Sequence, residues 1–219
     1  MSIYFISYLI VVIVSLICVL IGNKLFHPRN SLFIILTYLG FVVFLLGRFY
    51  ELSRVILGLD LYNVFELGSF GIIGALSFWL SSNLSIKQEV DIKATKSVTV
   101  KSILVSVLIG LLYFVDIFGE LTYLEYFIDF IVVLYCASNI YYFTRHLLLI
   151  EEDKTQLLKG LKLYNISGII LSVLVILLFL SFAYSSQILL LIVSILMCID
   201  LLEMIIAFKK GVAKWKKEN

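Results

Sequence analysis

"SLFIILTYLGFVVFLLGRFYELSR", residues 31–54, joins a long apolar run to three charged side chains. The run 31–48 has nearly the length of about 20 residues that a helix needs to cross a bilayer. Arg48 ends the run, and Glu51 and Arg54 follow it at three-residue intervals. This stretch predicts a membrane-spanning helix that ends in a cluster of charges.

The composition of the whole chain agrees with that prediction. Of its 219 residues, 62% are hydrophobic and only 15% are charged, whereas about a quarter of the residues in soluble domains are charged. A soluble core of this size could not cover so much apolar surface. The chain has one proline and no Gly/Ser-rich linker, so we expect a single membrane domain over 1–208 and a short basic tail over 209–219.

Seven segments of the chain are apolar and long enough to span a membrane as helices. They cover residues 3–22, 31–48, 62–81, 101–118, 121–144, 164–183 and 186–208. The strands of a membrane β-barrel would instead be about ten residues long and alternating. The first segment lacks the basic region and the cleavage site of a secretory signal. We therefore expect an all-α integral membrane protein built as a seven-transmembrane-helix bundle, with the first helix retained.

The basic residues predict the orientation of this bundle. Seven spans place the two termini on opposite sides of the membrane, and 15 of the 17 basic residues then fall on the side of the C-terminus. The positive-inside bias puts that side in the cytoplasm and the N-terminus outside the cell membrane. The outer side carries seven acids and only Arg48 and Arg54, a balance of −5, against +7 on the inner side.

Three polar segments on the inner side are candidates for contacts with lipid or with a partner. In the linker 82–101, apolar residues at even spacing suggest extended or hairpin-like structure. The segment 151–165 resembles a short helix lying in the membrane interface, and the tail 209–219 can bind anionic lipid headgroups. A protein partner could bind through 82–101 and 145–163, and the tail is too short to indicate nucleic-acid binding.

Several chemistries are excluded by missing residues. Three cysteines inside apolar runs, without CxxC spacing, indicate neither a disulfide framework nor a zinc site. Two histidines, His27 and His146, are too few for a haem or zinc centre inside the bundle. The segment 187–208 has no lysine for a retinal Schiff base, and no GxSxG or P-loop motif occurs. We therefore expect no enzyme activity, no cofactor and no metal.

Charges inside the spans need an explanation because each costs roughly 2.5–3.5 kcal/mol on insertion scales. Asp200 and Asp129 lie about 12 Å inside opposite membrane boundaries by helical rise, so they could share one polar path if their helices touch. Glu66 opens a glycine-rich span, in which Gly68, Gly71 and other small residues predict close helix packing. The same glycines could instead permit a helix break at a ligand site.

Two functions of different classes fit these features. The first is a transport or receptor-like protein that translocates or senses a small solute or ion in an outward-facing polar pocket. Its candidate ligand- or ion-binding residues are Arg48, Glu51, Arg54, Glu66, Asp116, Asp129 and Asp200. The second is a non-catalytic subunit or assembly factor of a larger membrane complex. The cluster at residues 48–54 can correspondingly be a salt ladder that caps the bundle or a lid that faces a ligand.

Overall fold

The computed structural model describes residues 3–25, 31–58, 67–89, 94–114, 123–150 and 156–218, and within these ranges every regular element is a helix. The elements are α1 (Ile3–Asn23), α2 (Leu32–Ile56), α3 (Leu67–Glu89), α4 (Lys96–Phe114), α5 (Tyr123–Leu149), α6 (Gln156–Gly160), α7 (Lys162–Ala183) and α8 (Gln187–Glu218). The all-α prediction is confirmed for the described ranges.

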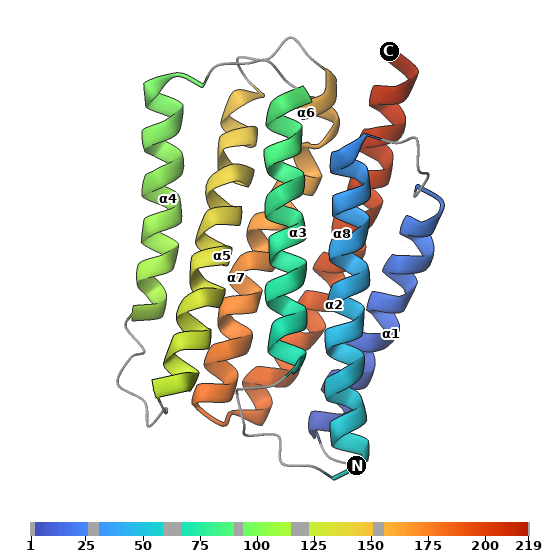
Figure 1. The fold of residues 1–219 in the computed structure, drawn as a ribbon, viewed down its shortest axis with the longest axis vertical. Coiled ribbons are helices and arrows are strands. Elements are labelled where there is room, and N and C mark those ends of the chain that lie inside the picture. The colour runs from blue at the N-terminus through green and yellow to red at the C-terminus, as the bar shows by residue number, and fades with distance from the viewer. Residues whose placement is uncertain are drawn as a thin grey trace.

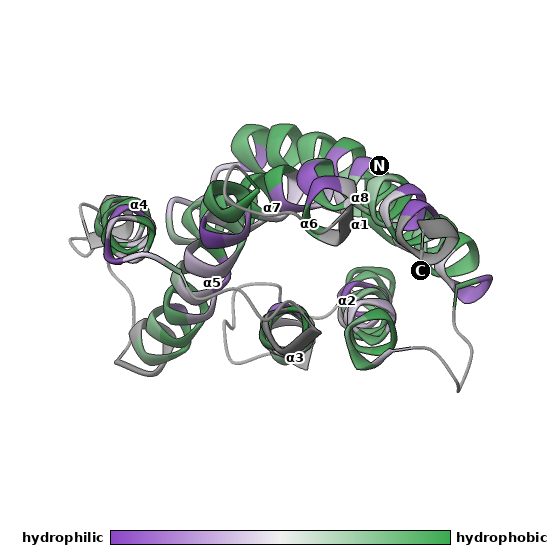
Figure 2. Cartoon of the chain, turned by 90° about the horizontal axis from the view of Figure 1, so that it is seen from above, coloured by the Kyte–Doolittle hydropathy of each residue, from purple (hydrophilic) through white to green (hydrophobic). Residues whose placement is uncertain are grey.

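The long helices run up and down along one axis, and the two termini lie at opposite ends of the bundle (Figure 1). We call the end with the N-terminus the lower end and the end with the C-terminus the upper end, as the bundle is drawn there. Seen along this axis, six helices close a ring in the order α1, α2, α3, α5, α7 and α8, each packed against the next (Figure 2). Helix α4 lies outside this ring, and its principal contact is α5.

The six helices of the ring are also those that are long and apolar enough to cross a membrane. Large apolar side chains face outward from them, among them Leu20 (60% exposed), Leu46 (61%) and Ile188 (70%). A lipid bilayer is the solvent that such a surface requires. The chain is therefore a helical multi-pass membrane protein. Helix α4, with Lys96 and Lys101 in its first turns, does not meet the same criterion over its described residues, so the count of seven spans stays a prediction.

The expected extended structure of the linker 82–101 is wrong for most of its length. Helix α3 continues through it to Glu89 and α4 already begins at Lys96, while residues 90–93 lie outside the described ranges. Ser82, Asn83 and Ile86 are buried, and this spacing is that of one helical face. Burying this face against the bundle favours a helix, although the alternation of apolar residues in the linker is typical of a strand.

The short helix expected in 151–165 is present as α6, but Leu158, its described apolar side chain, and the neighbouring Leu161 do not face a membrane surface. Leu158 and Leu161 are buried within the protein, and α6 packs against α8. The backbones of Gly160 and Gly211 approach each other so closely that a Cβ at Gly160 would meet the Gly211 carbonyl oxygen at 3.0 Å. Helix α8 runs through this contact without a break to Glu218, so the basic segment 209–218 continues the last helix.

The close packing that the glycines of α3 predict is present, and α2 is the partner. A Cβ at Gly47 would lie 2.8 Å from the Cα atom of Gly71, so the two backbones are in contact. Further along the same interface, the indole ring of Trp79 covers Gly40 and packs edge-on to Phe41 with 5.4 Å between ring centroids. Glycine residues thus allow α2 and α3 to touch, and aromatic side chains fill the space beside this contact inside the ring of helices.

We predict that Gly71→Ala lowers the free energy of unfolding by about 1–3 kcal/mol, because the new methyl group would meet the α2 backbone, which cannot move aside. Gly110→Ala is the matched control, since a Cβ there would make an ordinary 3.9 Å contact with the Ala137 Cβ. Thermal unfolding of the purified protein in detergent measures both. Equal stability of the two variants would contradict a backbone contact between α2 and α3.

Candidate functional site

The charge cluster of residues 48–54 lies on the last turns of α2, at the lower end of the bundle. Arg48 and Glu51 are one helical turn apart and form an ion pair, with 2.7 Å between the Arg48 Nη2 and Glu51 Oε1 atoms. Both residues are buried, at 2% and 4% exposure. The pair is therefore part of the protein interior at the lower end of the bundle, and the two predicted roles of the cluster, a salt ladder or a lid that faces a ligand, both stay predictions.

Helix α3 completes the surroundings of this pair. Arg48 also donates a hydrogen bond from Nη2 to the Gly68 carbonyl oxygen at 3.3 Å. The Glu51 carboxylate occupies the space where a side chain at position 68 would begin, so only glycine fits there. The Arg48 guanidinium lies over the Phe44 ring, 5.7 Å from its centroid, a geometry in which the ring attracts the cation.

Part of the pair's hydrogen-bonding capacity is unused. Among the described residues, neither Nε of Arg48 nor Oε2 of Glu51 has a hydrogen-bond partner. Arg48 lines a cavity of about 10 Å³ together with Tyr8, Val11, Leu178, Ser194 and Met197. This volume is close to the minimum that one water molecule needs. The cavity lies where α1, α2, α7 and α8 meet, so the guanidinium faces the inside of the ring.

Asp200 is a second buried charge inside the ring. It lies on α8, three residues after Met197 of the cavity, and is 4% exposed. The Ser167 hydroxyl of α7 lies beside it, but neither carboxylate oxygen has a hydrogen bond of good geometry to the described residues. A buried carboxylate with only a neutral hydroxyl beside it is unfavourable, so a proton, a water molecule or an ion would stabilise this position.

The structure describes two further candidates, Arg54 and Asp129, and they lie in different surroundings. Arg54 lies in the last turn of α2, is partly exposed and is close enough to Glu51 to attract its charge. Asp129 is buried on α5, but over the described ranges α8 is not among the helices that pack against α5. Their helices are not principal packing neighbours over these ranges, so a path shared by Asp129 and Asp200 stays a prediction. Glu66 and Asp116 lie outside the described residues.

A buried hydroxyl cluster in the upper half of the ring was not anticipated from the sequence. The Thr37 Oγ1 atom of α2 lies 2.6 Å from Ser82 Oγ of α3 and 3.5 Å from the Tyr164 hydroxyl of α7. Ser82 also donates to the Phe33 carbonyl oxygen at 2.9 Å. A hydroxyl side chain within an apolar run indicates that the group is buried. A single sequence does not show which helices bring such groups together.

Amide and imidazole groups lie next to this cluster. Asn165 follows Tyr164 on α7 and lies beside His146 of α5, and both residues are almost fully buried. The amide atoms of Asn165 and Nδ1 of His146 have no hydrogen-bond partner among the residues that the structure describes. The upper half of the ring thus contains polar groups that can still bind water or a proton.

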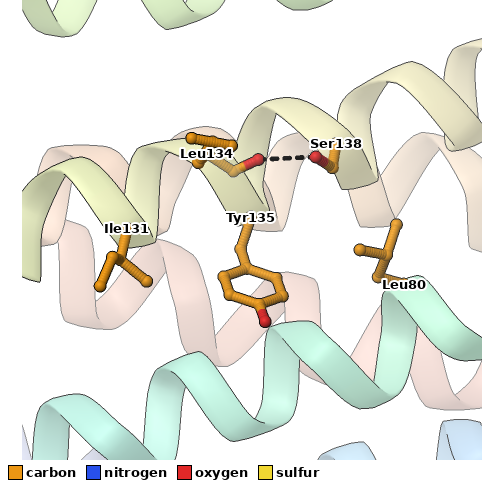
Figure 3. A pocket seen from close by; sticks show the side chains of 5 residues that line it. All are labelled: Leu80, Ile131, Leu134, Tyr135 and Ser138. Carbon is orange, nitrogen blue, oxygen red and sulfur yellow. Dashed lines mark hydrogen bonds between the residues drawn. The ribbon is translucent and has the colours of Figure 1, made fainter.

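An apolar groove lies outside the ring interior, between α3 and α5. It has a volume of about 260 Å³ and is lined by Leu80, Ile131, Leu134, Tyr135 and Ser138. Figure 3 shows the Tyr135 ring directed toward α3, while the Ser138 hydroxyl bonds to the Leu134 carbonyl oxygen of its own helix at 2.8 Å. Because the Ser138 hydroxyl is used within its own helix, the surface of the groove is mainly hydrophobic.

Comparisons with known proteins do not extend this picture. The chain matches no protein-family model, and neither the curated proteins nor the solved structures include one to which it is significantly similar. Within the described ranges, no group of three or more His, Cys, Asp or Glu side chains could hold a metal ion.

We predict that the Arg48–Glu51 pair contributes to stability as a unit. Arg48→Met or Glu51→Met alone leaves a buried charge unpaired and should cost about 3–5 kcal/mol, whereas the double variant leaves no charge and should lose much less than the sum. Unfolding free energies of the three variants and the wild type in one detergent give the coupling. Strictly additive losses would show that the two side chains do not depend on each other.

Proposed function

We propose that this protein translocates or senses a small ion at buried charged groups inside the six-helix ring. The observation that carries the proposal is Asp200, a buried acid on a membrane-spanning helix whose carboxylate oxygens have no partner among the described residues. Ionisable groups in such positions usually mark ion paths or proton relays. The group beside Asp200, the Ser167 hydroxyl, is neutral, whereas a buried acid kept only for structure would be expected to pair with a cation.

The Arg48 cavity supports the same proposal. A purely structural ion pair is expected to satisfy its hydrogen bonds within the protein, but Nε of Arg48 and Oε2 of Glu51 remain unused by the described residues. The guanidinium also lines a cavity into which the Tyr8 and Ser194 side chains project from two further helices. An ion that enters from the lower end would meet these groups before it reaches Asp200.

We further propose seven spans in the cell membrane, with α4 as the additional span and the upper end in the cytoplasm. Seven long helices that alternate in direction, with termini at opposite ends (Figure 1), support the count. The concentration of basic residues on the side of the C-terminus, 15 of 17, supports the orientation. In this arrangement the Arg48–Glu51 pair lies near the outer surface.

A second candidate, a non-catalytic subunit of a larger membrane complex, is favoured by the groove between α3 and α5 and by α4. The groove is apolar, and α4 exposes Leu104 (62%) and Leu108 (66%) outside the ring. Purification from native membranes separates the two candidates. A stoichiometric partner retained through purification would favour the subunit, and a partner-free protein that carries ions would exclude it.

The orientation can be tested with single cysteines, because Cys18, Cys136 and Cys198 are buried and should react little. Leu57, 71% exposed after the end of α2, and Lys209, exposed on α8, are suitable positions. In intact cells, we predict that a membrane-impermeant maleimide labels Leu57→Cys and labels Lys209→Cys only after the membrane is permeabilised. Labelling of both variants from the same side would contradict an odd number of spans.

Ion translocation can be tested by current measurements on the protein in planar lipid bilayers. We predict a protein-dependent current that falls at least tenfold in Asp200→Asn, because the amide keeps the shape of the side chain but cannot carry the charge. Lys209→Gln is the control for the loss of a charge on the same helix, since Lys209 is exposed and lies nine residues further on α8. An unchanged current in folded Asp200→Asn would contradict a role of Asp200.

A further inference from the structure

We infer that the ion is the proton, carried along a line of buried polar groups inside the ring from the Arg48–Glu51 pair to His146 near the upper end. This inference rests on the proposed ion translocation and names its substrate. Three regions of the ring carry it: the cavity beside Arg48, the surroundings of Asp200, and the hydroxyl cluster around Tyr164.

The lower region admits water but no larger solute. The cavity beside Arg48 has a volume of about 10 Å³, which is close to the minimum that holds one water molecule. A partly hydrated metal ion would need several oxygen ligands around it, and an organic solute needs a far larger space. A proton needs only one water molecule and a neighbouring acceptor. The hydroxyl side chains Tyr8 and Ser194 line the same cavity.

Asp200 is the next acceptor above this cavity. Its position, three residues after Met197, places it about 4.5 Å further along α8 by helical rise. The carboxylate has two oxygens without partners among the described residues, so it can accept a proton from water. Ser167 lies beside it on α7, and one turn further up that helix is Tyr164.

The upper region continues the line across three helices. The Tyr164 hydroxyl lies 3.5 Å from Thr37 Oγ1, and Thr37 Oγ1 lies 2.6 Å from Ser82 Oγ. Asn165, directly after Tyr164, lies beside His146. On α2 alone, Thr37 and Glu51 are separated by about 21 Å of helical rise, so the line covers most of the roughly 30 Å hydrocarbon core.

The packing beside this line excludes an open channel. The Trp79 ring centroid lies 5.4 Å from that of Phe41 and 6.2 Å from that of Phe44, and all three side chains are almost fully buried. These aromatic groups fill the space between the Arg48 cavity and the hydroxyl cluster on the side of α2 and α3. A proton can pass along α7 and α8 because it moves by exchange of hydrogen bonds. A hydrated metal ion cannot, because it needs open space.

Each transfer conserves atoms and charge. A protonated water in the cavity breaks one O–H bond and forms one on the Asp200 carboxylate, leaving neutral water and a neutral acid. Asp200 then returns to the carboxylate by giving its proton to the Ser167 hydroxyl, which passes its own proton to the next hydroxyl of the line. A water molecule held by the Asn165 amide, whose atoms have no partner among the described residues, takes the proton from the hydroxyl cluster and gives one of its own to a ring nitrogen of His146, which releases a proton from the other nitrogen. One proton enters and one leaves, and no co-reactant is needed.

The test uses full-length protein in liposomes that contain a pH-sensitive dye, with an inside-negative potential set by a potassium gradient and valinomycin. The wild type should acidify the lumen faster than empty liposomes. Tyr164→Phe should slow this acidification at least fivefold, because it removes a hydroxyl from the line with little change in shape. Tyr184→Phe is the matched control, since Tyr184 is 64% exposed after the end of α7.

A second measurement needs no variant. In planar bilayers, the reversal potential of the wild-type current should follow the pH gradient and ignore gradients of sodium, potassium or chloride. A current that follows one of those ions would overturn the proton inference but leave ion translocation intact. Folded protein that carries no current at all would overturn ion translocation, the part of the proposed function on which this inference rests. Equal acidification by folded Tyr164→Phe and Tyr184→Phe would overturn the route.

Discussion

The backbone contact between α2 and α3 at Gly47 and Gly71 is the constraint on which the rest of the interior depends. It brings Gly68 against the Glu51 carboxylate and its carbonyl oxygen within reach of Arg48. Because Arg48 Nη2 and Glu51 Oε1 lie only 2.7 Å apart, these two opposite charges can remain inside a protein whose outer surface requires lipid. A Cβ at Gly47 or Gly71 would meet the backbone of the facing helix, and a Cβ at Gly68 would meet the Glu51 carboxylate.

The bilayer imposes a second constraint, because a polar side chain that faces lipid is costly. In the ring, Arg48, Glu51, Asp200 and several amides and hydroxyls are buried, while many leucine and isoleucine side chains are exposed on the outside. Asp200, Asn165 and His146 then share an interior with tightly packed aromatic rings. Their unused hydrogen-bonding atoms are what distinguish this interior from that of a protein stabilised by packing alone.

Hydropathy and charge predicted the helical membrane class, the approximate helices and the i,i+3 pairing of Arg48 with Glu51, because these are local properties of the chain. Contacts between helices could not be predicted, since periodicity gives the buried face but not the partner. Thr37 and Tyr164 meet although they are 127 residues apart, and Asp129 and Asp200 lie on helices that are not packing neighbours among the described residues. The prediction for the linker 82–101 was wrong because it relied on the alternation of apolar residues there. The same segment also has a helical apolar face, and tertiary packing favours the helix.

An experimental structure in lipid nanodiscs, at a resolution that shows ordered water, tests most directly whether the ring has a hydrated polar interior. The account predicts water bound to Nε of Arg48 in the cavity with Ser194, and further water at the Asp200 carboxylate. A dry ring in which protein groups satisfy every polar atom of Arg48, Glu51 and Asp200 would contradict it. In that case the buried charges would serve only to hold the helices together.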